Sequence, residues 1–104
     1  MIFHIADRDR WLRSKAAGSY TASTIGMELE QQGFIHLSFE AQVPFVAGSF
    51  YRGVPNLVLL HVDESLLTAE LKVEQLDGAP EAFPHLYGPL NVDAVVAVTD
   101  PFVA

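Results

Sequence analysis

The chain has 104 residues and carries a formal charge of −7, and half of its residues are hydrophobic. This composition predicts a single globular domain over residues 1–104 and argues against an intrinsically disordered chain. With 13 acidic residues against 6 Lys and Arg, nucleic acid is disfavoured as a partner, and with no cysteine the chain forms neither disulfides nor thiolate metal sites.

The first element is expected to be a strand over residues 2–6, where β-prone residues alternate. A helix then follows over residues 7–18, because Asp7 is a suitable N-cap and Gly18 a suitable C-cap. Its basic residues are interleaved with acidic ones and are interpreted as a solvated face. Charges occur by residue 7 and no apolar run is long enough to cross a bilayer, so we expect no signal peptide, no membrane partner and a cytoplasmic location.

The next part of the chain predicts a helix, a strand and a third helix. The helix covers residues 24–32 and ends at Gly33, and the strand "FIHLS" covers residues 34–38. The third helix covers residues 40–51, and it tolerates Pro44 only if that residue lies in its first turn.

The second half of the chain is richer in strands. "LVLLHVD" at residues 57–63 predicts a buried strand, residues 64–67 a single turn, and residues 70–76 a half-exposed strand. "FPHLYGPL", residues 83–90, holds two prolines and a glycine, and we interpret it as a rigid turn between strands. A last strand is expected over residues 93–103.

Helices therefore concentrate in the N-terminal half of the chain, and strands in the C-terminal half. This segregation predicts an α+β domain rather than an alternating fold with a parallel sheet. We find no internal repeat, linker or low-complexity segment that would divide the chain further.

Four histidines are candidates for chemistry: His4, His36, His61 and His85. Their spacing is not typical of metal ligands, so we expect no metal site. His4 and His36 each fall inside a predicted strand, where a histidine with one backbone partner is the simplest interpretation. His61 falls in the most hydrophobic strand and is assigned to structure.

The other polar candidates also have structural interpretations. Glu74 would lie on a solvated strand face, Ser38 would cap the third helix, and the tyrosines would pack in the core. The sequence contains no nucleophile elbow and no glycine-rich phosphate loop of the GxGxxG or GxxxxGK[ST] type.

Several segments taken together resemble a known family. "IFHIADRDRW", "GFIHLSFEAQV", "LVLLHVDESLL", "VEQL" and "FPHLYGPLN" occur in the same order in the bacterial domain-of-unknown-function family 952, over essentially the whole chain. This resemblance implies the ADP-ribosyltransferase-like fold, which the RNA 2′-phosphotransferases share. In that fold, helices of the N-terminal half pack on a mostly antiparallel, split β-sheet.

The resemblance implies a cleft with three functional positions. The first, which bonds the ribose next to nicotinamide, corresponds to His4. The second, which lines the nicotinamide pocket, corresponds to His36. The third handles the ribose 2′-hydroxyl and corresponds to Glu74 or His85, of which we favour His85.

The resemblance further implies that Tyr20, Ser38 and Tyr87 lie around this cleft. The sequence shows no clear Lys or Arg clamp for a pyrophosphate, and Arg52 and Arg8 are the candidates for that contact. NAD would then be a substrate of the protein, with no metal involved. The family often has Asn-Arg where this chain has Gly48 and Ser49, so no contact that depends on that Arg is expected.

These observations leave several functions open. The first is an ADP-ribosyltransferase-like domain that binds NAD, or an ADP-ribosylated or phosphorylated small molecule, in a histidine-lined cleft and transfers or hydrolyses it. The alternatives are a non-catalytic domain of the same fold that binds a metabolite or a protein, an RNA 2′-phosphotransferase, and a cofactor-free isomerase or hydrolase. The RNA enzyme ranks lower because the chain is acidic.

Overall fold

The computed structural model describes residues 1–24, 26–76 and 78–104. Its strands are β1 (Ile2–Asp7), β2 (Ser19–Tyr20), β3 (Ile35–His36), β4 (Ser38–Phe39), β5 (Leu57–Val62), β6 (Glu70–Glu74), β7 (Phe83–Tyr87), β8 (Leu90–Asn91) and β9 (Val95–Phe102). Its α-helices are α1 (Arg8–Ala17), α2 (Leu29–Gln32) and α3 (Val43–Phe50), and its 3₁₀ turns are η1 (Glu40–Gln42), η2 (Glu64–Leu66) and η3 (Val92–Ala94).

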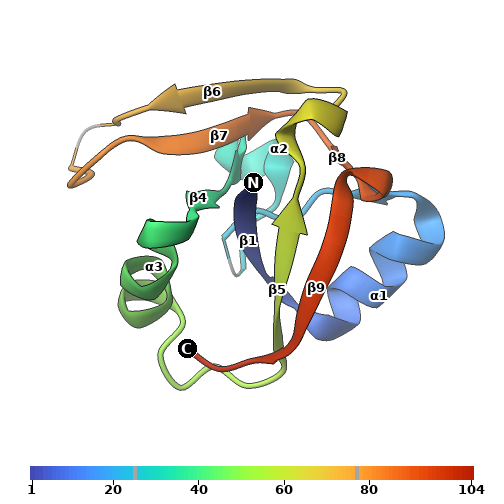
Figure 1. Cartoon of the computed structure of the whole chain (residues 1–104), viewed down its shortest axis with the longest axis horizontal. Helices are drawn as coiled ribbons and strands as arrows, with labels where there is room; N and C mark the ends of the chain where they lie inside the picture. Colours follow the sequence, from blue (N-terminus) through green and yellow to red (C-terminus); the bar gives the residue numbers. More distant parts are fainter. Residues whose placement is uncertain (25, 77) are drawn as a thin grey trace.

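The strands form three antiparallel sheets. One has four strands in the order β4-β1-β5-β9, one has three in the order β3-β7-β6, and one pairs β2 with β8. In Figure 1 the β6–β7 pair runs across the top of the molecule, α3 lies at the left and α1 at the right. The expected α+β domain, with helices in the first half of the chain and mostly antiparallel sheets, is confirmed.

The four-stranded sheet packs against side chains on both of its faces. Ile2 and Ala6 of β1 join a cluster that contains Trp11 of α1, whereas Phe3 and Ile5 join a second cluster that contains residues of α3. Alternate residues of a strand point to opposite faces, so β1 contributes to both clusters. Burial on both faces also explains the nearly continuous apolar run of β5.

The predicted first strand and first helix are confirmed. The Asp7 carboxylate accepts the backbone N–H of Arg10 at 2.9 Å, and Gly18 ends α1 with a φ of 89°. In the third helical segment, Pro44 does lie in the first turn of α3, as its missing N–H requires. The segment begins, however, with the separate 3₁₀ turn η1.

The helix expected over residues 24–32 is wrong in its first half, because α2 begins only at Leu29. Residue 25 of that expectation lies outside the described residues. Gly26 has a φ of 80°, which a helix does not accommodate, and Ala22 forms a β-bridge with Glu28 instead. Gly33 closes α2 as predicted, with a φ of 92°.

The strand expected over residues 34–38 belongs to two sheets rather than one. β3 pairs with β7, and β4, which begins at Ser38, pairs with β1. The crossing occurs at Leu37, whose backbone N–H donates to the carbonyl of Pro84 at 3.0 Å. This single crossing places β3 beside β7 and so positions the candidate site.

The interpretation of "FPHLYGPL" as a turn is wrong, because its first five residues form β7, the central strand of the three-stranded sheet. Pro84 has no N–H to donate, but its carbonyl accepts from Leu37, so it still takes part in the pairing. Alternation places Pro84 and Leu86 on the buried side and His85 on the opposite side.

Candidate functional site

One face of the three-stranded sheet carries two histidines. His36 of β3 lies directly opposite His85 of β7, and their ring centroids are 5.5 Å apart. Phe34 stacks on the His85 ring at 4.0 Å, and Phe83 lies 4.9 Å from the His36 ring. The register between β3 and β7 therefore builds a patch of stacked aromatic and imidazole rings.

This patch forms one wall of a cleft of about 580 Å³, within the usual size range of small-molecule sites. Side chains of α3 complete it, together with Leu76, Gly78, Ala79 and Pro80. Its aromatic lining residues are Phe34, Phe45, Phe50, Tyr51 and Phe83. Among the described residues, no Lys, Arg, Asp or Glu lines it. We call it the aromatic cleft.

Glu74 of β6 lies on the same face of the sheet as His85 and bonds to it. Its carboxylate accepts the Nδ1–H of His85 at 2.9 Å and also the hydroxyl of Tyr87. These hydrogen bonds, that of Tyr87 first and that of His85 second, lower the pKa of the Glu74 carboxyl. Because an ionised carboxylate only accepts, the Nδ1 of His85 carries a proton.

His36 faces the same cleft as a neutral imidazole. Burial, assisted by the neighbouring His85, lowers the pKa of His36 to about 4. Its side chain is half-buried and lines the aromatic cleft. At neutral pH the cleft thus presents His36 without a positive charge.

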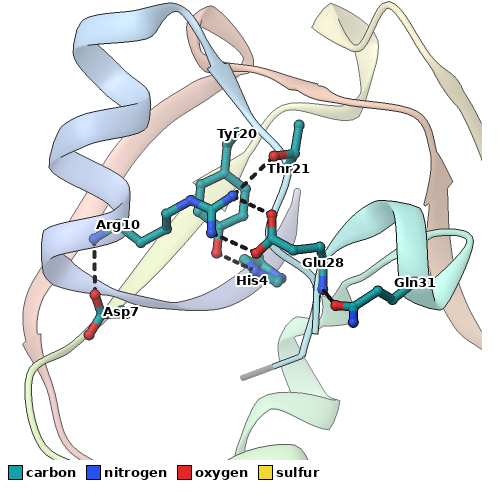
Figure 2. Close-up of polar contacts among 7 residues, drawn as sticks. All are labelled: His4, Asp7, Arg10, Tyr20, Thr21, Glu28 and Gln31. Atoms are coloured by element: carbon teal, nitrogen blue, oxygen red, sulfur yellow. Dashed lines mark hydrogen bonds and ion pairs between the residues drawn. The ribbon is translucent and has the colours of Figure 1, made fainter. Parts of the chain in front are cut away.

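His4 lies behind the aromatic cleft and does not line it, with only 3% of its surface exposed. Its Nδ1–H donates to the backbone carbonyl of His36 at 2.7 Å, so its Nε2 accepts the hydroxyl of Tyr20 at 2.9 Å (Figure 2). Burial, the main cause, lowers the pKa of His4 to about 4, and burial also raises the pKa of Tyr20. His4 therefore joins one residue from each of the other two sheets.

A second, more polar groove of about 300 Å³ adjoins the aromatic cleft. Both are lined by Thr24, Met27 and Tyr51. In this groove the Arg10 guanidinium binds both oxygens of the Glu28 carboxylate at 2.6 Å, as Figure 2 shows. The sequence does not predict this groove, because no local pattern indicates that Arg10 and Glu28 meet.

The sequence profile of the family described as "Protein of unknown function (DUF952)" matches residues 5–98. The chain belongs to the DUF952 family. The chain is similar to CC0527 from Caulobacter crescentus, with 39% sequence identity. The match to the crystal structure of CC0527 covers 94% of this chain and 82% of that one, with a TM-score of 0.80. The solution NMR structure of CC0527 gives a TM-score of 0.78 over 95% of this chain and 82% of that one. No curated protein sequence matched.

Of the three histidines expected to share a cleft in this DUF952 chain, His36 and His85 lie together and His4 does not join them. His36 and His85 line one cleft, while both ring nitrogens of His4 already have partners inside the protein. Glu74 and His85, which the sequence left as alternatives, are hydrogen-bonded to each other.

The other residues that were expected to contact a ligand lie in different parts of the molecule. Tyr20 lines the polar groove, and Tyr87 bonds Glu74 but does not line the aromatic cleft. Ser38 is buried in β4, and Phe39 rather than Ser38 is the N-cap of η1. Arg52 lines a third hollow beside the C-terminal residues of the chain.

The basic residues of α1 had been interpreted as a solvated face, and two of them are instead paired. Arg8 binds Asp100 and Asn56, and Arg10 binds Glu28. None of the helices in the described ranges is long and apolar enough to span a bilayer.

Proposed function

We propose that this DUF952 protein binds a small molecule with a planar ring in the aromatic cleft, and that His36 and His85 contact it. The observation that carries the proposal is the facing pair of histidines on a wall of aromatic rings, with His85 held by Glu74. Aromatic walls stack planar rings, and a few placed polar groups fix their orientation.

The Glu74–His85 pair has the arrangement of a general base. A carboxylate on Nδ1 fixes the imidazole orientation and makes Nε2 a better proton acceptor. His36 supplies a second neutral imidazole, with its ring centroid 5.5 Å from that of His85. This pair favours proton transfer, by an isomerase or a hydrolase, as the second candidate function.

The hypothesis of ADP-ribosyl chemistry, with NAD as substrate, rests on the resemblance of this chain to the ADP-ribosyltransferase-like superfamily. It is supported by the gathering of His36, His85 and Glu74, and by an aromatic cleft that suits a nicotinamide ring. Two observations weigh against it. His4 has no free ring nitrogen for a ribose, and no cation among the described lining residues of the aromatic cleft would meet a pyrophosphate.

An RNA 2′-phosphotransferase is the least favoured of these proposals. Phosphate backbones are held chiefly by Lys and Arg, whereas this chain has a formal charge of −7. A non-catalytic, ligand-binding domain is the alternative that the buried, fully bonded His4 favours.

Calorimetric titration with nicotinamide, ADP-ribose and NAD tests the proposal, together with chromatography for released nicotinamide. We expect at least one of these ligands to bind, and His85→Asn to weaken that binding about tenfold through the lost hydrogen bond. His61→Asn is the matched control, since His61 bonds Thr99 on β9 and does not line the aromatic cleft.

Nicotinamide release would identify the ADP-ribosyl chemistry, and binding without release would identify a binding domain. The absence of binding by all three ligands, or equal weakening by His85→Asn and His61→Asn, would contradict the proposal.

A further inference from the structure

The polar atoms that the histidines offer to a ligand in the aromatic cleft are acceptors. Glu74 accepts the Nδ1–H of His85, so in the neutral form of this imidazole Nε2 carries a lone pair. His36 is a neutral imidazole with one unprotonated nitrogen, because burial disfavours its charged form. A ligand that complements these two side chains therefore donates hydrogen bonds.

The aromatic lining also has a preference of charge. The faces of Phe and Tyr rings carry a negative quadrupole, so they attract cations that lie against them. Five such residues line the aromatic cleft: Phe34, Phe45, Phe50, Tyr51 and Phe83. No Lys or Arg among the described lining residues opposes this attraction.

Glu74 adds a carboxylate beside this wall, on the same face of the sheet, with its Oε1 2.9 Å from His85 Nδ1. Lys72, whose Nζ lies 5.0 Å from the centre of the Tyr87 ring, offsets it weakly, because Lys72 is exposed and its charge is screened by solvent. In the adjoining polar groove, Arg10 is neutralised by its pair with Glu28. Glu74 is thus a carboxylate bonded directly to a side chain that lines the aromatic cleft.

We propose that the aromatic cleft selects planar cations that donate N–H hydrogen bonds, such as amidinium groups or protonated amino-heterocycles, over neutral or anionic rings of the same shape. This inference rests on the proposed function and names its class of ligand. Glu74 sets the preference without touching the ligand, both by its charge and by its hold on the tautomer of His85.

Three ligands of one shape and different charge test the inference: benzamidinium, benzamide and benzoate. In calorimetric titrations at pH 7, we expect benzamidinium to bind about tenfold more tightly than benzamide, and benzoate to bind most weakly. Glu74→Gln should reduce the ratio of benzamidinium to benzamide affinity several-fold, and a loss of structure alone would not change that ratio. Glu70→Gln removes the same charge from an exposed position of the same strand and should leave the ratio unchanged.

Benzamide binding as tightly as benzamidinium would overturn the inference and leave the proposed function standing. An unchanged ratio in Glu74→Gln would overturn the role of Glu74. If none of the three binds while nicotinamide, ADP-ribose or NAD does, the cation preference is wrong and the cleft remains a ligand site. If neither set binds, both proposals fail.

Discussion

His4 uses each of its ring nitrogens once, donating from Nδ1 to the carbonyl of His36 and accepting at Nε2 from Tyr20. Of the two neutral tautomers, only the one with its proton on Nδ1 makes both hydrogen bonds, since a carbonyl cannot donate. The burial that lowers the pKa of His4 to about 4 favours the same form. The local geometry and the charge state of this residue thus support each other.

Replacing Tyr20 by Phe should measure how much the buried hydrogen bond between Tyr20 and His4 contributes to stability. Tyr20→Phe leaves the His4 Nε2 acceptor buried without its partner, which should lower the free energy of unfolding by about 1–3 kcal/mol. Tyr87→Phe is the matched control. Its hydroxyl lies on a side chain that is 37% exposed, so we expect a loss of about 1 kcal/mol or less. Urea unfolding of both variants measures the difference, and equal losses would contradict the prediction.

The sequence identified most of the candidate residues but not how they are arranged. His36 and His85 are 49 positions apart, and only the register of β3 against β7 makes them neighbours. The hydrogen bond between Glu74 and His85 is not predicted by the sequence either, because a carboxylate on a half-exposed strand is usually solvated. Contacts made by tertiary pairing leave no local pattern in a single sequence.

At the scale of elements, local rules worked where the chain makes its own contacts. Asp7 and Gly18 mark the ends of α1 through hydrogen bonds and backbone angles within the helix itself. β7 was missed because Pro84 and Gly88 are typical of turns, whereas pairing with β3 and β6 overrides that preference. The conformation of a strand that pairs on both sides is set by the neighbouring strands and not by its own local sequence.

Gly88, which follows β7, should prove necessary because of a close approach and not because of its backbone angles. A Cβ placed there would lie 2.7 Å from the Cβ of Ala69, so Gly88→Ala should destabilise the protein by about 1–3 kcal/mol. Ala69→Gly removes the clashing atom, and the double variant Gly88→Ala/Ala69→Gly should recover stability relative to Gly88→Ala. Thermal or urea unfolding of the single and double variants measures this, and a double variant less stable than Gly88→Ala would contradict the explanation.

At the scale of the whole molecule, one buried side chain connects the three sheets. His4 belongs to the four-stranded sheet, Tyr20 to the two-stranded sheet and His36 to the three-stranded sheet. The aromatic cleft and the polar groove adjoin each other around this connection and share Thr24, Met27 and Tyr51. The stability of the fold and the geometry of the candidate site therefore depend on the same neutral histidine.

This dependence predicts a loss of stability in mild acid. The pKa values of His4 and His36 are lowered from 6.5 to about 4 in the folded protein, so the unfolded chain takes up protons first as the pH falls. The stabilisation is fully present above pH 6.5 and is lost as the pH falls towards 4. For His4 the shift is equivalent to about 3 kcal/mol.

Urea unfolding at several pH values between 7.5 and 4.5 checks this prediction. We expect the free energy of unfolding to fall across this range, and to fall less steeply in His4→Gln. An NMR titration of the His4 ring in the wild-type protein gives an independent measurement if the variant does not fold. A stability that stays constant from pH 7.5 to 4.5 would contradict the account.

The central claim is that the aromatic cleft is the ligand site and that His36 and His85 contact the ligand. The chain contains four histidines, and they can serve as probes in one experiment: an imidazole ¹H–¹³C spectrum recorded during titration with nicotinamide and with benzamidinium. We predict that the resonances of His36 and His85 shift together and saturate, while those of His61, which bonds Thr99 on β9, stay in place. Resonances of His36 and His85 that do not move with either ligand, or a shift of His61 as large as theirs, would contradict the claim.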